Sequence, residues 1–520
     1  MRMDLVMAVD VGSTTARAGL FDPAGRCLAR ATAPFATHRP QIDHVEHSSD
    51  DIWQAVCLAT CAAVREAGAA PASLRGLAFD ATCSLAVFDR AGLPVTASGT
   101  GDDRWNVVMW ADHRAVLEAE EITATRHRAL RHVGGVMSPE MQLPKLLWLK
   151  RHLPDSWRRL GLAFDLADFL AWRATGQVAM SACTVTCKWA FLNHEATGWQ
   201  PDLLERVGLA DFRARTGLPD QATPVGAAVG PLTAAGAGDL GLTERCIVGA
   251  GLIDAHAGGL YLLGGCGAGQ LDRNLAMIAG TSTCHMAASL EPRFVPGVWG
   301  PYAGAMLPGT WLNEAGQSAT GALLDHILDW HARGSSLGPD RHGPVTERAA
   351  ALLDRHGPSM ADGLRVLPDF NGNRSPIADP GKRGIIEGLT LDASFDSLVR
   401  LYYAAAVGIA LGTRHIVDAL GAAGYRIDTL HLAGGHAGSP MLPQLYADAT
   451  GCSVVLRGGV DSILAGTACV AATAAGFYPG VGTSVIGMAT HDQRLSPRPE
   501  HRRHLDREYD HFLRMTAAPV

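Results

Sequence analysis

The sequence has no dense run of lysine or arginine, no CxxC pair and no signal-peptide-like apolar core near its first residue. With a formal net charge of −7, it lacks the basic footprint of a nucleic-acid-binding protein. Its eleven cysteines are scattered, and without a CxxC pair neither a zinc site nor a disulfide framework is expected. These absences favour a reduced, cytoplasmic protein that does not bind nucleic acid.

Familiar nucleotide-binding fingerprints are also missing. The only Gly-Lys pair, Gly381-Lys382, is followed by arginine, so the chain has no P-loop. No GxGxxG stands directly after a predicted strand, which removes the simplest dinucleotide-binding interpretation. Residues 334–338 match the esterase pattern GxSxG, but they follow a predicted helix rather than a strand, so we expect a flexible loop there.

One long stretch, residues 463–490, carries no charged side chain. It is rich in alanine, glycine and threonine and contains a Pro-Gly pair, whereas membrane spans carry more leucine, isoleucine, valine and phenylalanine. Asp461 and Ser462 are typical of a helix N-cap, so we predict a buried, alanine-rich helix that runs to about Ala475. We therefore expect no membrane association.

Glycine is abundant, with fifty-nine residues that cluster in short loops, where glycine permits positive φ or the close approach of a ligand. A chain of 520 residues is long enough for two or three domains. Two stretches, residues 8–21 and 276–289, share an order of strand, Gly/Ser/Thr turn and strand. This echo predicts two related halves, which we place at residues 1–271 and 272–520.

A third glycine-rich turn, residues 434–439, follows a predicted strand and precedes a predicted helix at about 442–450. Backbone N–H groups in such turns form concave anion sites, and a following helix N-terminus adds partial positive charge. A single turn of this kind is usually an ordinary hairpin. Three of them, at 12–15, 280–283 and 434–439, are what a nucleotide's phosphate chain would need from two facing domains.

Two aspartates are candidates for the accompanying chemistry. Asp10 ends the first predicted strand beside the turn at 12–15, where a carboxylate could hold magnesium through waters; an ordinary turn cap is the alternative. Asp254 opens a predicted apolar helix, and a helix N-cap is the simpler explanation on the local sequence. A general base is the other, because phosphoryl transfer needs a group that receives the hydroxyl proton, and apolar neighbours would limit water access.

Taken in order, these motifs resemble those of the FGGY carbohydrate kinases, within the actin/Hsp70/sugar-kinase superfamily. Residues 9–17 look like the first phosphate motif of the family, and residues 138–150 resemble its first signature. Residues 280–282 are similar to the second phosphate motif, and residues 434–440 to the adenosine motif. The resemblance implies an α/β protein with two ribonuclease-H-like domains of the actin-like ATPase kind.

The resemblance also implies the ligands and their sites. ATP and Mg²⁺ would lie in a cleft between the two domains. Residues 1–271 would form its sugar and phosphate side, and residues 272–520 its adenosine side. Asp254 matches the catalytic base and Asp10 the metal-associated aspartate. The positions that match nucleotide contacts are Gly12, Ser13, Thr14, Thr15, Arg17, Gly280, Thr281, Ser282, Gly434, Gly435 and Ser439.

Sugar-contacting positions of the ribulokinase branch are matched by Cys83, Lys188, Asp254 and Glu314. Without the resemblance, Lys188 and Glu314 would read as ordinary surface charges. Residues 43–53, 110–115 and 372–376 look like the pentulose branch of the family, and the triplet Thr82-Cys83-Ser84 resembles that of D-ribulose kinases. At His47, His436 and Gly438 the sequence departs from the motifs of the family. These differences affect the expected nucleotide preference more than the expected activity.

The function implied is ATP-dependent transfer of the γ-phosphate to the terminal hydroxyl of a pentulose, D-ribulose foremost, to give D-ribulose 5-phosphate. L-ribulose, ribitol and xylulose remain as alternative substrates. An actin/Hsp70-like, ATP-driven binding protein is the alternative of another class, although little chain remains after residue 480 for a peptide-binding domain. The expected partners are a small sugar and ATP, and homodimer formation stays open.

Overall fold

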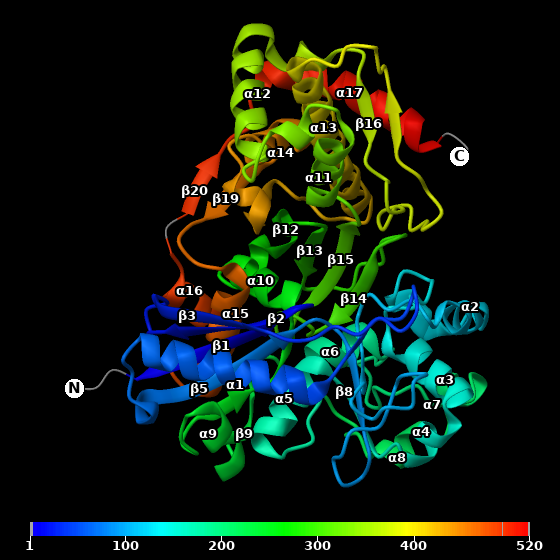
Figure 1. Cartoon of the computed structure of the whole chain (residues 1–520), viewed down its shortest axis with the longest axis vertical. Coiled ribbons are helices and arrows are strands. Elements are labelled where there is room, and N and C mark those ends of the chain that lie inside the picture. Colours follow the sequence, from blue (N-terminus) through cyan, green and yellow to red (C-terminus); the bar gives the residue numbers. More distant parts are fainter. Residues whose placement is uncertain (1–3, 491, 518–520) are drawn as a thin grey trace.

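The computed structural model describes residues 4–490 and 492–517. The chain forms two lobes, and each lobe is built around a sheet that has seven strands in the described part of the chain. Figure 1 shows one lobe above the other, with most of the N-terminal half below and most of the C-terminal half above.

The first sheet has the strand order β3-β2-β1-β5-β10-β9, and β11 pairs with β5. The strands β1, β2 and β3 form an antiparallel meander, and β5 joins β1 in parallel. β1 is buried along its whole length, as expected of a strand covered on both faces of a sheet. The bounds are β1 (Leu5–Val11), β2 (Thr15–Phe21), β3 (Cys27–Pro34), β5 (Leu74–Ala81), β9 (Ala228–Pro231), β10 (Ile247–Gly249) and β11 (Leu252–Ile253).

The second sheet has the order β14-β15-β13-β12-β18-β19-β20. Its centre, β15-β13-β12-β18-β19, repeats the arrangement β3-β2-β1-β5-β10, a meander joined by parallel strands. This is the predicted ribonuclease-H-like topology in both lobes. The bounds are β12 (Asn274–Ala279), β13 (Thr283–Ser289), β14 (Trp299–Ala303), β15 (Trp311–Gln317), β18 (Thr429–Ala433), β19 (Ser453–Arg457) and β20 (Asp492–Leu495).

Two smaller sheets extend the lobes. The sheet β4-β7-β6-β8 belongs to the lower lobe, and the hairpin β16-β17 belongs to the upper lobe. Their bounds are β4 (Glu46–His47), β6 (Leu85–Phe88), β7 (Val107–Val108), β8 (Leu162–Asp165), β16 (Arg365–Leu367) and β17 (Ile385–Glu387).

The helices pack around these sheets and between them. In the first half they are α1 (Ser49–Glu66), α2 (Val116–Ala124), α3 (Gln142–His152), α4 (Pro154–Arg159), α5 (Leu166–Thr175), α6 (Ala182–Lys188), α7 (Pro201–Arg206), α8 (Phe212–Thr216), α9 (Ala234–Leu240) and α10 (Asp254–Leu263). In the second half they are α11 (Gly321–Trp330), α12 (His342–His356), α13 (Phe395–Ala422), α14 (Leu442–Thr450), α15 (Ser462–Ala474), α16 (Val481–Met488) and α17 (Pro499–Ala517).

Helix α15 joins the two halves of the chain. It packs against α10, β1 and β5, and its apolar side chains belong to the core of the first lobe together with those of α16. Asp461 caps α15, because its side chain accepts hydrogen bonds from the second and third residues of the helix, as predicted. The division of the chain at residues 271 and 272 stays a prediction, since helices of the second half complete the first core.

By length and composition, one described helix, α13, is apolar enough to cross a membrane. Most of its apolar stretch is buried inside the protein, where it contacts α11, α12 and α14. The sequence analysis had considered residues 463–490 instead, and these form α15 and α16 of the first core.

Local predictions were confirmed to within a few residues. The predicted strands around the turns at 12–15 and 280–283 are the pairs β1–β2 and β12–β13. The helix predicted at 442–450 is α14. The N-cap of α1 is Ser48, whose hydroxyl accepts from the N–H of Asp51.

Candidate active site

Three aspartates meet at one edge of the first sheet. Asp10 on β1 lies opposite Asp80 on the parallel strand β5. The next strand, β11, pairs its Leu252 with Asp80 and is followed directly by Asp254, the first residue of α10. Because parallel strands end at a common edge, residues 10, 80 and 254 come together although they are far apart in the chain.

Asp10 is buried and is held by one arginine. Oδ2 of Asp10 accepts a hydrogen bond from Nε of Arg17 at 2.5 Å, and the same guanidinium donates to Oδ2 of Asp461 at 2.6 Å. Burial raises the pKa of Asp10 to about 6; Arg17 opposes this rise and the nearby Asp254 adds to it. The structure thus places Arg17, predicted to contact the nucleotide, between two carboxylates, and the nucleotide contact stays a prediction.

Asp80, which the sequence analysis did not select, is the third carboxyl group of this edge. Its Oδ2 accepts a hydrogen bond from Thr467 at 2.5 Å, and its buried Oδ1 has no partner among the described residues. Burial and then Asp10 raise the pKa of Asp80 above its ordinary value. The edge therefore brings together the carboxyl oxygens of residues 10, 80 and 254, and oxygen ligands of this kind suit a hard divalent cation.

Asp254 stands at the start of α10. Oδ1 of Asp254 accepts from the N–H of Ala255 at 2.7 Å, and Oδ2 makes no hydrogen bond within residues 4–490 and 492–517. Burial raises the pKa of Asp254 despite the nearby Lys188. The helix-cap explanation is partly correct, because Oδ1 accepts a backbone N–H at the start of α10. Oδ2 remains able to accept a proton from a substrate.

Lys188 and Glu314 are not surface charges, so that interpretation was wrong. They are 3% and 5% exposed, and they come from opposite lobes, Lys188 from the end of α6 and Glu314 from β15. Nζ of Lys188 lies 4.6 Å from the ring centroid of Trp299, the residue opposite Glu314 on β14. Burial lowers the pKa of Lys188, but neighbours that include Glu314 outweigh it and hold the pKa above its usual value.

Glu314 is held by two hydrogen bonds. Its Oε1 accepts from Arg374 at 2.8 Å, and its Oε2 lies 3.1 Å from Nε2 of His256. Burial alone would raise the pKa of Glu314, but Lys188, His256 and Arg374 together hold it well below the usual range. The carboxylate is therefore ionised, and it is tied to residues of both lobes.

Cys83 lies just beyond β5, beside this cluster. It is buried, and burial raises the pKa of its thiol to about 12, so the group is a neutral thiol. Its carbonyl oxygen accepts from the amide of Gln142 at 3.2 Å, and the same amide donates to Asp165 at 2.7 Å. Cys83 thus offers a small, weakly polar wall rather than a nucleophile.

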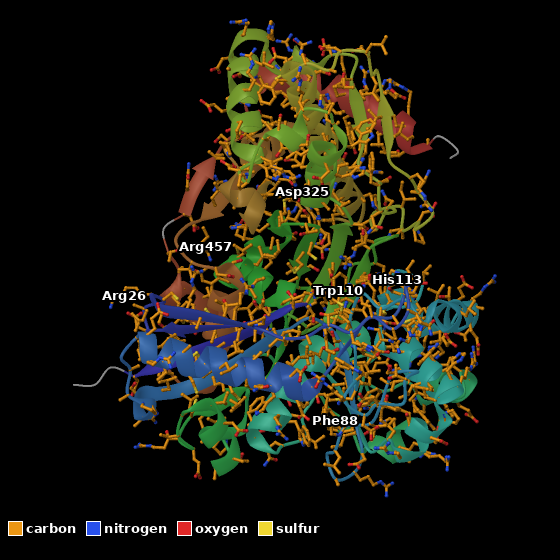
Figure 2. All side chains as sticks on the ribbon, in the orientation of Figure 1. Arg26, Phe88, Trp110, His113, Asp325 and Arg457 are labelled. Atoms are coloured by element: carbon orange, nitrogen blue, oxygen red, sulfur yellow. The ribbon has the colours of Figure 1, made fainter. Side chains whose placement is uncertain are left out.

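The first two turns predicted to bind phosphate are each closed by a backbone hydrogen bond from their first glycine. The N–H of Gly12 donates to the carbonyl of Thr15 at 3.0 Å, and that of Gly280 donates to Ser282 at 2.9 Å. In each turn a threonine is exposed, at Thr14 and Thr281. The hydroxyl of Ser13 accepts from the indole of Trp110 at 3.2 Å, a residue labelled in Figure 2.

The third turn requires glycine at its first position. Gly434 has φ +87°, and a Cβ there would lie 2.4 Å from the carbonyl of Ala279, whereas a Cβ on Gly435 would meet nothing within 4 Å. The hydroxyl of Ser439 accepts from the N–H groups of Met441 and Leu442 at 3.3 and 3.2 Å. The structure gives Ser439 a role at the start of α14, and its predicted nucleotide contact stays a prediction.

The departures at His47 and His436 are buried inside the protein. Nδ1 of His436 lies 2.9 Å from the hydroxyl of Tyr446, and burial lowers the pKa of His436 to about 4. His47 makes a T-shaped contact with the ring of Phe35, and burial lowers the pKa of His47 to about 4 as well. Both imidazoles are therefore neutral at physiological pH and pack as parts of the fold.

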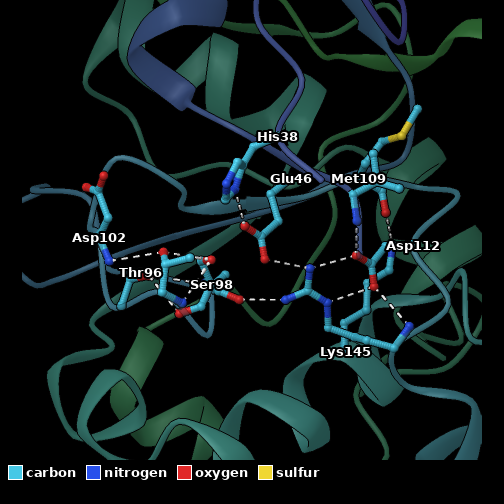
Figure 3. Close-up of polar contacts among 12 residues, drawn as sticks. His38, Glu46, Thr96, Ser98, Asp102, Met109, Asp112 and Lys145 are labelled. Carbon is cyan, nitrogen blue, oxygen red and sulfur yellow. Dashed lines mark hydrogen bonds and ion pairs between the residues drawn. The ribbon is translucent and has the colours of Figure 1, made fainter. Parts of the chain in front are cut away.

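Two of the segments that carry the pentulose-branch resemblance, residues 43–53 and 110–115, are joined by a buried ionic network, which Figure 3 shows. The guanidinium of Arg114 donates to Asp112 at 2.8 and 2.7 Å and to Glu46 at 2.8 Å. The other carboxylate oxygen of Glu46 lies 3.0 Å from Nδ1 of His38. Lys145, from the signature segment, donates to the carbonyl of Met109 at 3.0 Å.

Sequence reasoning missed three residues that complete the cluster around Glu314. Arg374 lies in a segment singled out at 372–376 without a role, His256 is two residues after Asp254, and Trp299 had no signal in its local sequence. The guanidinium of Arg374 lies 4.5 Å from the ring centroid of Trp299, so this ring contacts two cations. Of these signals, only the position of His256 two residues after the candidate base could have identified it as a residue of the site.

Comparison with known proteins identifies the family of the chain. The family model described as the N-terminal domain of the FGGY family of carbohydrate kinases matches residues 5–260, and that of the C-terminal domain matches residues 275–475. An FGGY carbohydrate kinase domain-containing protein of Homo sapiens is 43% identical over 98% of this chain and 95% of its own length.

Two further similarities concern named kinases. A D-ribulokinase of Saccharomyces cerevisiae is 35% identical over 90% of this chain and 71% of its own length. The solved structure of a xylulose kinase from Rhodospirillum rubrum superposes with a TM-score of 0.81 over 99% of this chain and 98% of that one. At 21% identity, the second similarity concerns the fold alone.

Proposed function

Since the chain belongs to the FGGY family of carbohydrate kinases, we propose that its acceptor is a pentulose, and D-ribulose before the others. The protein is an ATP-dependent phosphotransferase of this family. The observation that carries the proposal is the cluster at the junction of the lobes, where Asp254 lies beside Lys188 and the ionised Glu314. Similarity to the D-ribulokinase of Saccharomyces cerevisiae supports the choice of sugar.

The sugar would lie against the cluster that both lobes share. Lys188 and Arg374 offer N–H donors, and Glu314 accepts hydrogen bonds from hydroxyl groups; a polyol needs both kinds of partner. Because Glu314 is held ionised and oriented by its neighbours, its carboxylate is arranged before the sugar arrives, which reduces the entropy cost of binding.

Phosphoryl transfer then requires little covalent chemistry from the protein. The terminal hydroxyl of the pentulose, O5 in D-ribulose, attacks the γ-phosphorus of ATP, and the bond between that phosphorus and the oxygen of ADP breaks. The free oxygen of Asp254 accepts the hydroxyl proton. A raised pKa makes the carboxylate a better proton acceptor than an exposed aspartate, provided that the pH keeps it ionised.

Phosphate groups of ATP would be bound by the turns at Gly12–Thr15 and Gly280–Ser282, with the adenosine near Gly434 and Gly435. Asp10, with the unpartnered Oδ1 of Asp80 beside it, would hold Mg²⁺, which would supply charge neutralisation for the phosphates. All eleven cysteines have free thiols, which supports the proposed reducing, cytoplasmic location. A homodimer stays a prediction.

The proposal is tested by measuring sugar-dependent ADP release with D-ribulose, L-ribulose, D-xylulose, ribitol, L-arabinitol and glycerol. We expect the highest kcat/KM with D-ribulose. A higher kcat/KM with L-ribulose, ribitol or xylulose would replace the proposed substrate with that sugar and keep the reaction. Turnover that ignores every sugar but rises with an unfolded polypeptide would contradict the sugar-kinase activity of this chain and favour an ATP-driven binding protein.

A further inference from the structure

A buried histidine stands between the proposed base and the proposed sugar-binding carboxylate, and the mechanism above gives it no task. His256 is 0% exposed and lies on α10, two residues after Asp254. Its Nε2 is 3.1 Å from Oε2 of Glu314, and its Nδ1 is 3.2 Å from Sγ of Cys183. Both ring nitrogens therefore have partners, one from each lobe.

The partners determine how the two ring nitrogens are bonded. Glu314 is ionised and can only accept, so Nε2 of His256 donates to it. Burial raises the pKa of Cys183 well above its usual value, and the sulfur accepts from the N–H of Ile253 at 3.4 Å. This thiol and Nδ1 of His256, 3.2 Å apart, form the second hydrogen bond of the ring.

These bonds form one continuous chain. It starts at the N–H of Ile253, the residue before the base, passes through Cys183 and His256, and ends at Glu314 and Arg374. Cys183 and His256 belong to α6 and α10, whereas Glu314 lies on β15 of the other sheet. The chain of bonds thus connects the backbone beside the base to the carboxylate that faces it.

We propose that His256 is a positioning residue that fixes the carboxylate of Glu314 relative to Asp254 and thereby sets the affinity for the sugar. The inference rests on the proposed function. His256 is buried behind Glu314 and acts through it. A hydrogen bond to an ionised group contributes enough that its loss lowers affinity by roughly tenfold to a hundredfold.

Two substitutions distinguish positioning from mere packing. In His256→Gln the amide nitrogen can reach the place of Nε2 and donate to Glu314, whereas in His256→Asn the shorter amide reaches only the place of Nδ1. We expect His256→Asn to raise the KM for the pentulose by about tenfold to a hundredfold, more than it raises the KM for ATP. We expect His256→Gln to recover most of this loss.

His431→Asn is the matched control. His431 is also buried, and its Nε2 bonds Asn274 at 2.8 Å, between the strands β18 and β12 of the second sheet. Thermal unfolding of all three variants measures the cost of removing a buried imidazole. We expect His431→Asn to lower the unfolding temperature without changing the KM for the sugar.

The wild-type protein, measured in the same assay, separates failure of the proposed kinase function from failure of the proposed role of His256. If the wild type shows no sugar-dependent ADP release, the proposed function fails and the inference with it. If the wild type is active but His256→Asn keeps its sugar KM, or if His256→Gln and His256→Asn raise it equally, the inference alone is overturned. Should His256→Asn not fold, replacing both thiols that contact Nδ1, Cys183 at 3.2 Å and Cys187 at 3.9 Å, by alanine removes these partners and leaves the imidazole; a raised sugar KM then supports the proposal, and an unchanged one overturns it.

Discussion

Replacing Asp254 by asparagine removes the proposed base and leaves the fold nearly untouched. The Oδ1 of asparagine can still accept the N–H of Ala255, a bond of 2.7 Å in this structure, so the start of α10 should be preserved. The amide cannot accept the hydroxyl proton. Loss of a positioned general base costs about 10²- to 10⁴-fold in rate, which corresponds to about 3 to 5 kcal/mol in the activation free energy.

The pH dependence gives this prediction a second readout. Burial raises the pKa of Asp254 above its ordinary value of 3.8, and the base acts only when ionised. Sugar-dependent kcat/KM of the wild type should therefore fall as the pH is lowered through a pKa above 3.8. The residual kcat/KM of Asp254→Asn should not show this fall at low pH, the acid limb of the profile.

The assay is sugar-dependent ADP release by wild type and variant at several pH values, with thermal unfolding to show that both are folded. Sugar-free ADP release is measured in parallel and subtracted. A folded Asp254→Asn protein that keeps its sugar-dependent rate within about threefold would refute the assignment of Asp254 as base. The same holds if the variant keeps the acid limb of the wild type.

Three further predictions concern the surroundings of the site. Arg114→Met should lower the free energy of unfolding by about 3 to 5 kcal/mol, because it leaves buried carboxylates unpaired; denaturant titration measures this loss. Gly434→Ala should raise the KM for ATP and destabilise the protein by about 1 to 3 kcal/mol through backbone strain, and Gly435→Ala should do so less. Arg374→Lys should lower kcat/KM for the pentulose by about tenfold to a hundredfold, because a charge-assisted bond to Glu314 is lost.

Each of these has a result that would contradict it. A denaturation midpoint unchanged by Arg114→Met would mean that the network of Figure 3 is not a source of stability. Equal effects at Gly434 and Gly435 would remove the steric argument for the third turn. An Arg374→Lys protein with wild-type sugar kinetics would show that Glu314 is held without the arginine.

The sequence predicted what depends on short-range patterns. Hydrophobic runs separated by Gly/Ser/Thr turns are local, and both hairpins and α14 were located from them. The cap at Asp461 was found for the same reason. At the start of α1 such patterns are ambiguous, because three polar residues in a row, Ser48 to Asp50, all suit the N-cap and only the backbone geometry distinguishes them.

Contacts between distant segments were not predictable. Arg17 bonds to Asp461, 444 positions away, and Asp80 bonds to Thr467, 387 positions away. No local periodicity encodes such pairs, because they arise when α15 packs on the first sheet. The apolar helix α13 was not considered in the sequence analysis, and its composition alone would not place it, since a helix buried in a large core and a membrane span share composition.

The position of Glu314 links sugar binding to the relative placement of the lobes. Its carboxylate is balanced by Lys188 and His256 from the first half and by Arg374 from the second. If the lobes moved apart, Glu314 would lose the first two partners and keep only the third. A buried carboxylate loses much of its stabilisation in this way, so the closed arrangement is favoured by the charge cluster itself. A sugar that bridges Lys188 and Glu314 would add to the same preference, and closure would then expel water from around Asp254.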